Sequence, residues 1–270
     1  MSSSMDFTLS KYKSLLQSFI GAGYAILTYE QYCKRSSLPD KFVILRHDID
    51  RLPSQALRVA ELEHKLSVHS TYYFRIVKQS NNPDIIRSIA DKGMEIGYHY
   101  EDLSLCHGDW QKAEKHFAES LDYFRGFYPV CTVCMHGVPA SHIDNKTLWQ
   151  HTDYHRFGII GEPYLNTDFN DVFYLTDTGR CWDGYKVSVR DKVPQQQAMW
   201  VKNSWVYHTT DDLVNALRNG TFPAHVLLTT HPQRWHNRVG YWLYEWLCQH
   251  IVNAVKYVLV NFLRKQSASY

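Results

Sequence analysis

The stretch Val43-Ile44-Leu45-Arg46-His47-Asp48-Ile49-Asp50 is an apolar run of strand character that ends in charged residues shortly before Pro53. Side chains alternate along a strand, so Asp48 and Asp50 are predicted to point to the same face. There they could share one cation, or divide the roles of base and ligand. A calcium loop would need more oxygen ligands and a central glycine after Asp50, where the chain continues Arg51-Leu52-Pro53. Standing alone, the two acids would suggest only a helix cap and a surface acid.

Three later segments repeat this design of an apolar run that ends in residues able to bind a metal. They are 94–101 (MEIGYHYE), 131–137 (CTVCMHG) and 226–232 (VLLTTHP). Helical stretches separate the four segments. Because the carboxyl ends of parallel strands meet at one rim, the pattern predicts an α/β sheet or barrel with its functional residues at that rim.

The alternation of elements continues along the chain. Helices are predicted over 9–20, 55–66, 84–92 and 110–125, and strands over 41–45, 70–76 and 130–135, with weaker strands over 157–160, 172–175 and 226–230. No repeat or linker divides the 270 residues, so a single domain over 1–270 is expected. A C-terminal helix over about 241–264 is apolar but is interrupted by polar residues such as Glu245 and Gln249. It is predicted to pack on the domain rather than to span a membrane, and peripheral membrane contact stays open as an alternative.

Composition narrows the function classes. A net charge of +2 without a basic stripe argues against nucleic acid as a partner. Six irregularly spaced cysteines and no apolar leader predict reduced thiols and a cytoplasmic location, and the Cys131-x-x-Cys134 pair is expected to pack in the core. No dinucleotide fingerprint, phosphate loop or nucleophile elbow is present, so nucleotide binding and serine hydrolysis are not supported.

Taken in order, the Asp-x-Asp strand end, the Gly-Tyr-His strand end, the His-Gly-x-Pro segment and the late Leu-Leu-Thr-Thr-His-Pro resemble the polysaccharide deacetylase superfamily, carbohydrate esterase family four. The resemblance, closest to chitooligosaccharide deacetylases, spans roughly residues 43–235. It implies an α/β fold, a distorted (β/α) barrel with about seven parallel strands. It also implies an enzyme that removes acetyl groups from sugars with a divalent metal, usually zinc.

Matched motif by motif, the resemblance places the family's catalytic base at Asp48 and its metal-binding aspartate at Asp50. It places the first metal-binding histidine at His99 and the histidine that protonates the leaving group at His231. Two departures mark the chain as a divergent member. Leu103 stands where the family usually has its second metal histidine, and Met135-His136-Gly137-Val138-Pro139 replaces the usual Arg-x-Pro signature.

The third metal ligand must therefore come from another position, because hydrolytic zinc sites normally keep three protein ligands. His136 is the first choice, since alternation along its strand turns it inward. His107, on the loop after His99, is the second, and Glu101, on the same face as His99, is the third. His136 could equally be an ordinary hydrogen-bonded histidine at a strand end.

Several further residues are candidates around this site. Arg46 or Arg75 could tune the base Asp48. Sugars pack their C–H faces on aromatic rings, so Tyr100 and Trp235, with Glu101, are predicted to bind substrate. Core packing is the competing interpretation for any one ring.

The sequence is thus interpreted as a cytoplasmic, metal-dependent hydrolase that removes acetyl from an N-acetylated sugar or glycoconjugate, with a divalent cation, zinc by the resemblance, as cofactor. Two alternatives are kept. One is hydrolysis of a non-sugar C–N bond, as in allantoinase-like relatives. The other is an inactive relative that binds metal or carbohydrate, which the missing histidine at Leu103 suggests.

Overall fold

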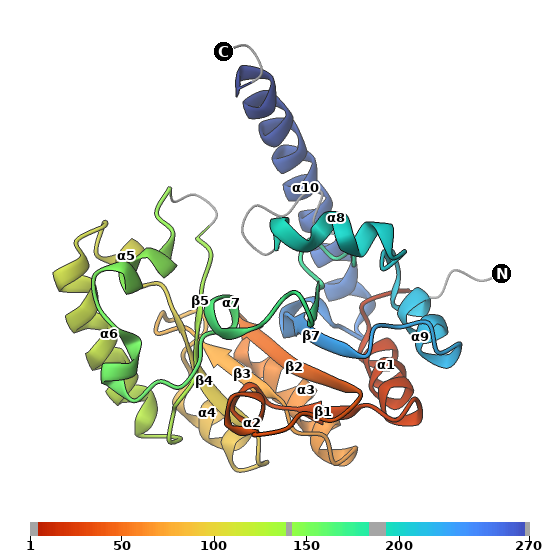
Figure 1. The fold of residues 1–270 in the computed structure, drawn as a ribbon, viewed down its shortest axis with the longest axis horizontal. Coiled ribbons are helices and arrows are strands. Elements are labelled where there is room, and N and C mark those ends of the chain that lie inside the picture. The colour runs from red at the N-terminus through yellow and green to blue at the C-terminus, as the bar shows by residue number, and fades with distance from the viewer. Residues whose placement is uncertain (1–4, 139–141, 184–192, 268–270) are drawn as a thin grey trace.

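The computed structural model describes residues 5–138, 142–183 and 193–267, with side chains up to residue 253. Seven parallel strands form one curled sheet in the order β5-β4-β3-β2-β7-β6, with β1 also paired to β2. The strands are β1 Ala25–Leu27, β2 Phe42–Ile49, β3 Thr71–Phe74, β4 Glu95–Tyr100, β5 Val133–Met135, β6 Phe173–Thr176 and β7 His225–Thr230. Since β5 and β6 are not paired, the sheet is a half-open barrel (Figure 1). The predicted α/β distorted barrel is confirmed.

Helices surround this sheet (Figure 1). The longer ones are α1 Leu9–Gly21, α3 Pro53–Lys65, α4 Pro83–Ala90, α6 Trp110–Arg125, α8 Pro194–Lys202, α9 Thr210–Arg218 and α10 Val239–Ser267. Shorter ones are α2 Tyr29–Lys34, α5 Asp102–Leu105 and α7 Pro163–Asn166. Helix α3 packs on β2, and α4 and α6 pack on β4. These helices cover the outer face of the sheet, and the inner face lines the barrel interior.

Strand β2 lies in the middle of the sheet, and all eight of its residues are buried. It pairs with β3 on one side, where Asp48 is opposite Tyr73, and with β7 on the other, where Arg46 is opposite Thr229. Neighbours in register share a face of a parallel sheet, so Arg46 and Asp48 point into the barrel interior. Arg46 and Asp48 can be buried in this strand because they form an ion pair with each other.

The strand predicted over residues 157–160 is wrong. Residues 154–157 form a 3-10 helix, and it ends at Gly158, whose φ of 71° breaks an extended chain. The sheet gains only an isolated bridge between Thr132 and Gly161 at this point. The short elements β1, α2, α5 and α7, together with α8 and α9, were not predicted. Three- to six-residue elements carry too little periodicity to be recognised.

The C-terminal helix extends over Val239–Ser267, a few residues beyond the predicted range at both ends. Its first half contacts the domain, and its second half projects away from it (Figure 1). None of the six cysteines forms a disulfide, and of the pair expected in the core Cys134 is buried whereas Cys131 is half-buried. Among the helices in the part of the chain that the structure describes, none has the length and apolarity needed to cross a bilayer.

A buried hydrogen-bond network ties α1 and α3 to the outer face of the sheet. The Glu63 carboxylate, on α3, is fully buried and accepts bonds from Tyr12 on α1, from Ser70 Oγ and Tyr72 Oη at 2.6 Å each, and lies 2.8 Å from His47 Nε2. Burial alone raises the pKa of Glu63, but His47 and the hydroxyl donors lower it below its ordinary value overall. The carboxylate is therefore the charged centre of this network.

Glu63→Ala is expected to destabilise the fold by about 3–5 kcal/mol, because it leaves several buried donors without an acceptor. Chemical denaturation measures the loss, and Glu61→Ala, an exposed position on the same helix, is the control. Because the folded-state pKa of Glu63 is lowered, its stabilisation is present at neutral pH and is lost as the pH falls through that folded pKa. A loss within the error of the control would contradict this account of the network.

Candidate metal centre

Four strand ends bring one aspartate and three histidines together at the rim. Asp50 follows β2, His99 lies in β4, and His136 and His231 follow β5 and β7. The Asp50 Oδ1 atom is 3.7 Å from His99 Nε2 and 3.5 Å from His136 Nε2, and Asp50 Oδ2 is 3.8 Å from His231 Nε2. All three imidazoles thus turn the same ring nitrogen toward a single carboxylate. The structure brings together the predicted residues Asp50, His99 and His136.

The other nitrogen of each imidazole has its own acceptor. His99 Nδ1 is 2.9 Å from the carbonyl oxygen of Cys134, and His136 Nδ1 is 2.9 Å from Glu101 Oε2. His231 Nδ1 is 2.6 Å from Asp177 Oδ1. We assign the ring proton to Nδ1 in each case, because a carbonyl or carboxylate oxygen can only accept. For His99 and His136, this assignment leaves the Nε2 lone pair of the neutral ring directed toward Asp50.

The donor set fits a divalent cation. Asp50 Oδ1 is buried and has no hydrogen-bond partner among the residues that the structure describes, whereas Asp50 Oδ2 accepts a bond from Gln233 at 3.2 Å. An unpaired carboxylate oxygen beside imidazole lone pairs is what a metal would satisfy. Ligand atoms of Asp50, His99 and His136 all lie within 4.8 Å of one another. The Asp50 side chain is 26% exposed, so solvent reaches this side of the site.

Electrostatics favours the ligand-competent forms of these groups. Burial, with His136 next to it, holds the pKa of His99 well below the ordinary imidazole value, so the ring is neutral. Burial alone raises the pKa of Asp50, but the three histidines lower it below the usual aspartate value overall. A neutral imidazole and an ionised carboxylate are the forms that bind metals.

A second cluster, Asp48, His99 and Cys134, also has donor atoms close enough to hold an ion. Both oxygens of Asp48 are already engaged, because Arg46 Nε lies 2.8 Å from Oδ1 and Arg46 Nη2 lies 2.6 Å from Oδ2. A cation there would compete with a buried guanidinium for one carboxylate. The set around Asp50 is therefore the better metal site.

Arg46 fixes the orientation of Asp48. The guanidinium is fully buried, binds the carboxylate in a bidentate manner, and lies over the rings of Tyr73 and Tyr164. Asp48 Oδ2 stays 3.6 Å from His99 Nε2, beside the Asp50 set but outside it. The sequence predicted Arg46 or Arg75 as the partner of Asp48, and in the structure the partner is Arg46.

The other two candidates for third ligand lie elsewhere. His107 is exposed on the loop after α5 and belongs to neither cluster of possible ligands. Glu101 lies behind His136 and is also held by Arg75, whose Nε and Nη2 lie 2.8 and 2.9 Å from its oxygens. Arg75 Nη1 also reaches the backbone oxygen of Asp50 at 3.1 Å. Glu101 is thus placed to orient His136 rather than to contact a metal beside Asp50.

Glu101→Gln is expected to weaken metal binding by about 10- to 100-fold, because an amide can present either its oxygen or its NH2 group to His136 and no longer fixes the ring tautomer. Competition with a chromophoric chelator measures the affinity. Glu114→Gln, on the outer helix α6, is the matched control. An affinity equal to that of the unchanged protein would show that Glu101 does not support the site.

The aromatic residues predicted to bind substrate are inside the protein. Tyr100 is fully buried against Phe117 and accepts a bond from Trp149 Nε1 at 2.8 Å. Trp235 is 1% exposed and donates from Nε1 to Asp177 Oδ2 at 2.7 Å. Neither ring has a face open to a sugar, so substrate contact by these two residues has no support from their positions.

Asp177 lies beside this site, and sequence reasoning could not select it. It follows β6 directly, is fully buried, and binds His231 through Nδ1 and, at 2.9 Å, through the backbone N–H. Arg234 Nη1 is 2.7 Å from Asp177 Oδ1 and 2.6 Å from His231 Nδ1. Asp177 Oδ1 can thus accept from both His231 Nδ1 and Arg234 Nη1. The only sequence signal for Asp177 was an acid after a strand, which several other residues share.

Comparisons with known proteins add little. No family model and no curated protein matches the chain. One matching solved structure is a mutant of a CE4-family pseudoenzyme with restored enzymatic activity. It has 12% sequence identity and a TM-score of 0.40, and the match covers 90% of this chain and 67% of the other. A similarity at this level carries no argument, and the proposals below depend on the geometry and the sequence motifs of this chain.

Proposed function

We propose that this protein is a metal-dependent hydrolase that removes acetyl groups from an N-acetylated sugar or glycoconjugate. The observation that carries the proposal is the convergence of three imidazole Nε2 atoms on Asp50, whose Oδ1 atom has no hydrogen-bond partner within the described part of the chain. A site of this composition, partly open to solvent, suits a catalytic cation. The sequence motifs that resemble carbohydrate esterase family four suggest the acetyl group and the sugar.

Asp50, His99 and His136 would hold the ion. When bound, a divalent cation there would supply Lewis-acid polarisation of the acyl carbonyl and make water more acidic. Asp48, held next to this set by Arg46, would accept the proton of the attacking water. Because Arg46 fixes both carboxylate oxygens, Asp48 would not need to reorient for that transfer.

His231 would donate a proton to the departing amine, which is otherwise too basic to leave. Burial and the nearby Arg234 lower the pKa of His231, but Asp177 and Asp50 raise it above the ordinary imidazole value overall. The ring can therefore be protonated near neutral pH and can transfer a proton from Nε2, the atom that faces the site. Asp177 would hold the ring in position through Nδ1, as the carboxylates of acid–base triads do.

An acetate-release screen on metal-loaded protein tests this proposal. N-acetylated sugars and oligosaccharides form one arm, and ureides and simple amides form the other. Acetate release from the sugar arm, abolished by a chelator and restored by zinc, is expected. Turnover of ureides alone would assign a non-sugar C–N bond instead. Metal binding without turnover of any substrate would indicate an inactive binding relative.

A further inference from the structure

The first half of α10 has its polar side turned inward and its apolar side turned outward. Its inward contacts come from Trp242, Glu245 and Asn253, which recur at helical spacing on one side. The exposed large hydrophobic residues are Val239, Tyr241, Leu243, Tyr244, Trp246, Leu247, Ile251 and Val252. This is the reverse of the usual surface helix, which turns its apolar side to the core.

The inward side is fixed by specific polar contacts. Glu245 is buried, and its two oxygens lie 2.7 and 2.8 Å from Arg51 Nη2. Asn253 Nδ2 donates to the carbonyl oxygen of Gly179 at 2.8 Å, and Arg180 Nη1 donates to that of Trp242 at 3.0 Å. The guanidinium of Arg180 also lies over the ring of Trp242. The helix therefore cannot rotate to bury its apolar side without losing these bonds.

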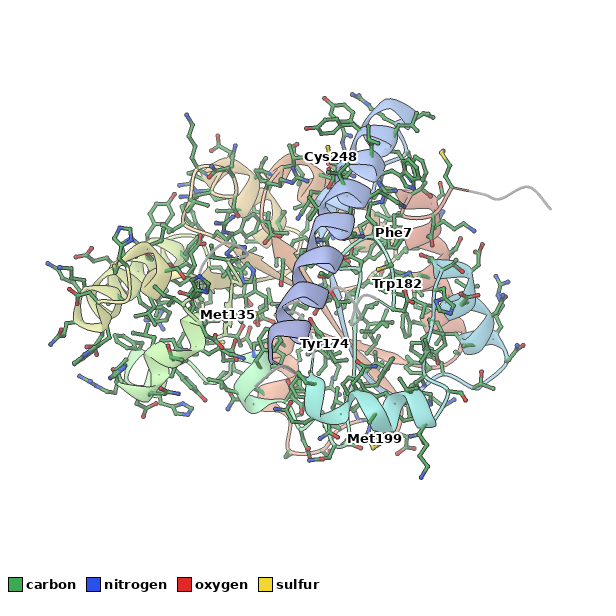
Figure 2. The ribbon with its side chains drawn as sticks, turned by 90° about the horizontal axis from the view of Figure 1, so that it is seen from above. Phe7, Met135, Tyr174, Trp182, Met199 and Cys248 are labelled. Atoms are coloured by element: carbon green, nitrogen blue, oxygen red, sulfur yellow. The ribbon has the colours of Figure 1, made fainter. Side chains whose placement is uncertain are left out.

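The apolar side covers a wide arc. At 3.6 residues per turn, the exposed hydrophobic residues occupy roughly two thirds of the circumference, and Trp242, Glu245 and Asn253 lie within the remaining third. Two packed helices bury only a narrow stripe on each helix. A flat apolar medium can cover a much wider arc. Figure 2, in which α10 is seen from above, labels Cys248 on the first half of the helix.

The charges of α10 are complementary to an anionic surface. Glu245 is its only acid, and this acid is buried against Arg51. The outward arc carries no acidic residue, and the rest of the helix sequence adds Lys256, Arg264 and Lys265. Exposed Tyr and Trp residues, here Tyr241, Tyr244 and Trp246, are the aromatic types enriched at the membrane–water interface.

We propose that the outward side of α10, defined by Leu243, Tyr244, Leu247 and Ile251, binds the surface of an anionic lipid bilayer. The exposed apolar side chains would enter the acyl boundary, and the composition of the helix, three basic residues and one buried acid, would favour an anionic over a neutral surface. The helix contacts Arg51, next to Asp50, and Gly179, two residues after Asp177. Lipid binding would therefore bring the rim that carries the candidate metal centre close to the bilayer.

Co-sedimentation of the full chain with vesicles tests this proposal without using activity. The vesicles contain phosphatidylcholine either alone or mixed with phosphatidylglycerol. Binding to the mixed vesicles is expected, weakened by salt and by removal of phosphatidylglycerol. The combined variant Leu243→Ser/Leu247→Ser/Ile251→Ser should lower the partition coefficient about a hundredfold, because three apolar side chains no longer contribute to burial in the bilayer.

The matched control replaces three exposed apolar residues elsewhere, Ile20→Ser/Leu38→Ser/Leu165→Ser, and should bind as the unchanged protein does. Thermal melting of both variants shows that they are folded. No binding of the unchanged protein to the mixed vesicles would overturn the proposal, and so would an equal loss in the control. The alternative is that a second copy of the chain binds this side of the helix, and light scattering without lipid tests it. A dimer of the unchanged protein that becomes a monomer in the α10 variant would support that alternative and contradict the proposal.

Discussion

Asp48→Asn is expected to keep the metal and to lose turnover by about a hundred- to ten-thousand-fold. The asparagine side chain has nearly the same shape as aspartate, and its oxygen can still accept one bond from Arg46. An amide oxygen is far too weak a base to take a proton from water. The metal set around Asp50 does not include Asp48, so binding should persist.

Steady-state kinetics with elemental analysis of the same samples measures both quantities. Asp84→Asn, which changes an exposed aspartate on α4, should leave both unchanged. A near-normal rate in Asp48→Asn would remove this residue from the mechanism. Loss of the metal would make Asp48 a ligand and would favour the cluster with Cys134.

His231→Ala is expected to slow amide substrates far more than acetate esters with good leaving groups, because only the amine needs a proton to depart. His208→Ala, at an exposed histidine that pairs with Asp183, is the control and should change neither rate. Equal slowing of amides and esters would assign His231 to positioning or to metal support. No slowing of either would make it a structural residue of the rim.

The pH profile gives an independent measure of the same residue. A general acid must be protonated, so activity is full below its pKa and falls as the pH rises through it. Asp177 and Asp50 raise the pKa of His231 above the ordinary imidazole value of about 6.5, against the opposing effects of burial and Arg234. The alkaline limb should therefore lie above that value. It should flatten in His231→Ala and move to lower pH in Asp177→Asn.

The strand ends were predictable because each one combines an apolar run with an abrupt polar stop. β2, β4 and β7 carry the pattern in only a few residues, and the alternation of strand faces was enough to place Asp48 and Asp50 on one side. Helices α3 and α6 were predictable from their periodicity over 13 and 16 residues.

The connections between side chains were not predictable. Alternation along β5 ranked His136 first as third ligand, but only the folded chain places Glu101 behind it and leaves His107 exposed. The pairing of Asp177 with His231 joins residues 54 positions apart, and local sequence holds no information on such a contact. Tyr100 and Trp235 were assigned to the substrate by residue type, and their burial depends on packing partners far along the chain.

The central claim is that Asp50, His99 and His136 bind one divalent cation. Elemental analysis of purified protein, after dialysis against zinc and removal of excess metal, tests it most directly. One equivalent is expected in the unchanged protein and in His107→Ala, with a large loss in Asp50→Ala, His99→Ala and His136→Ala. One equivalent in all four variants, each shown to be folded by circular dichroism, would contradict the account.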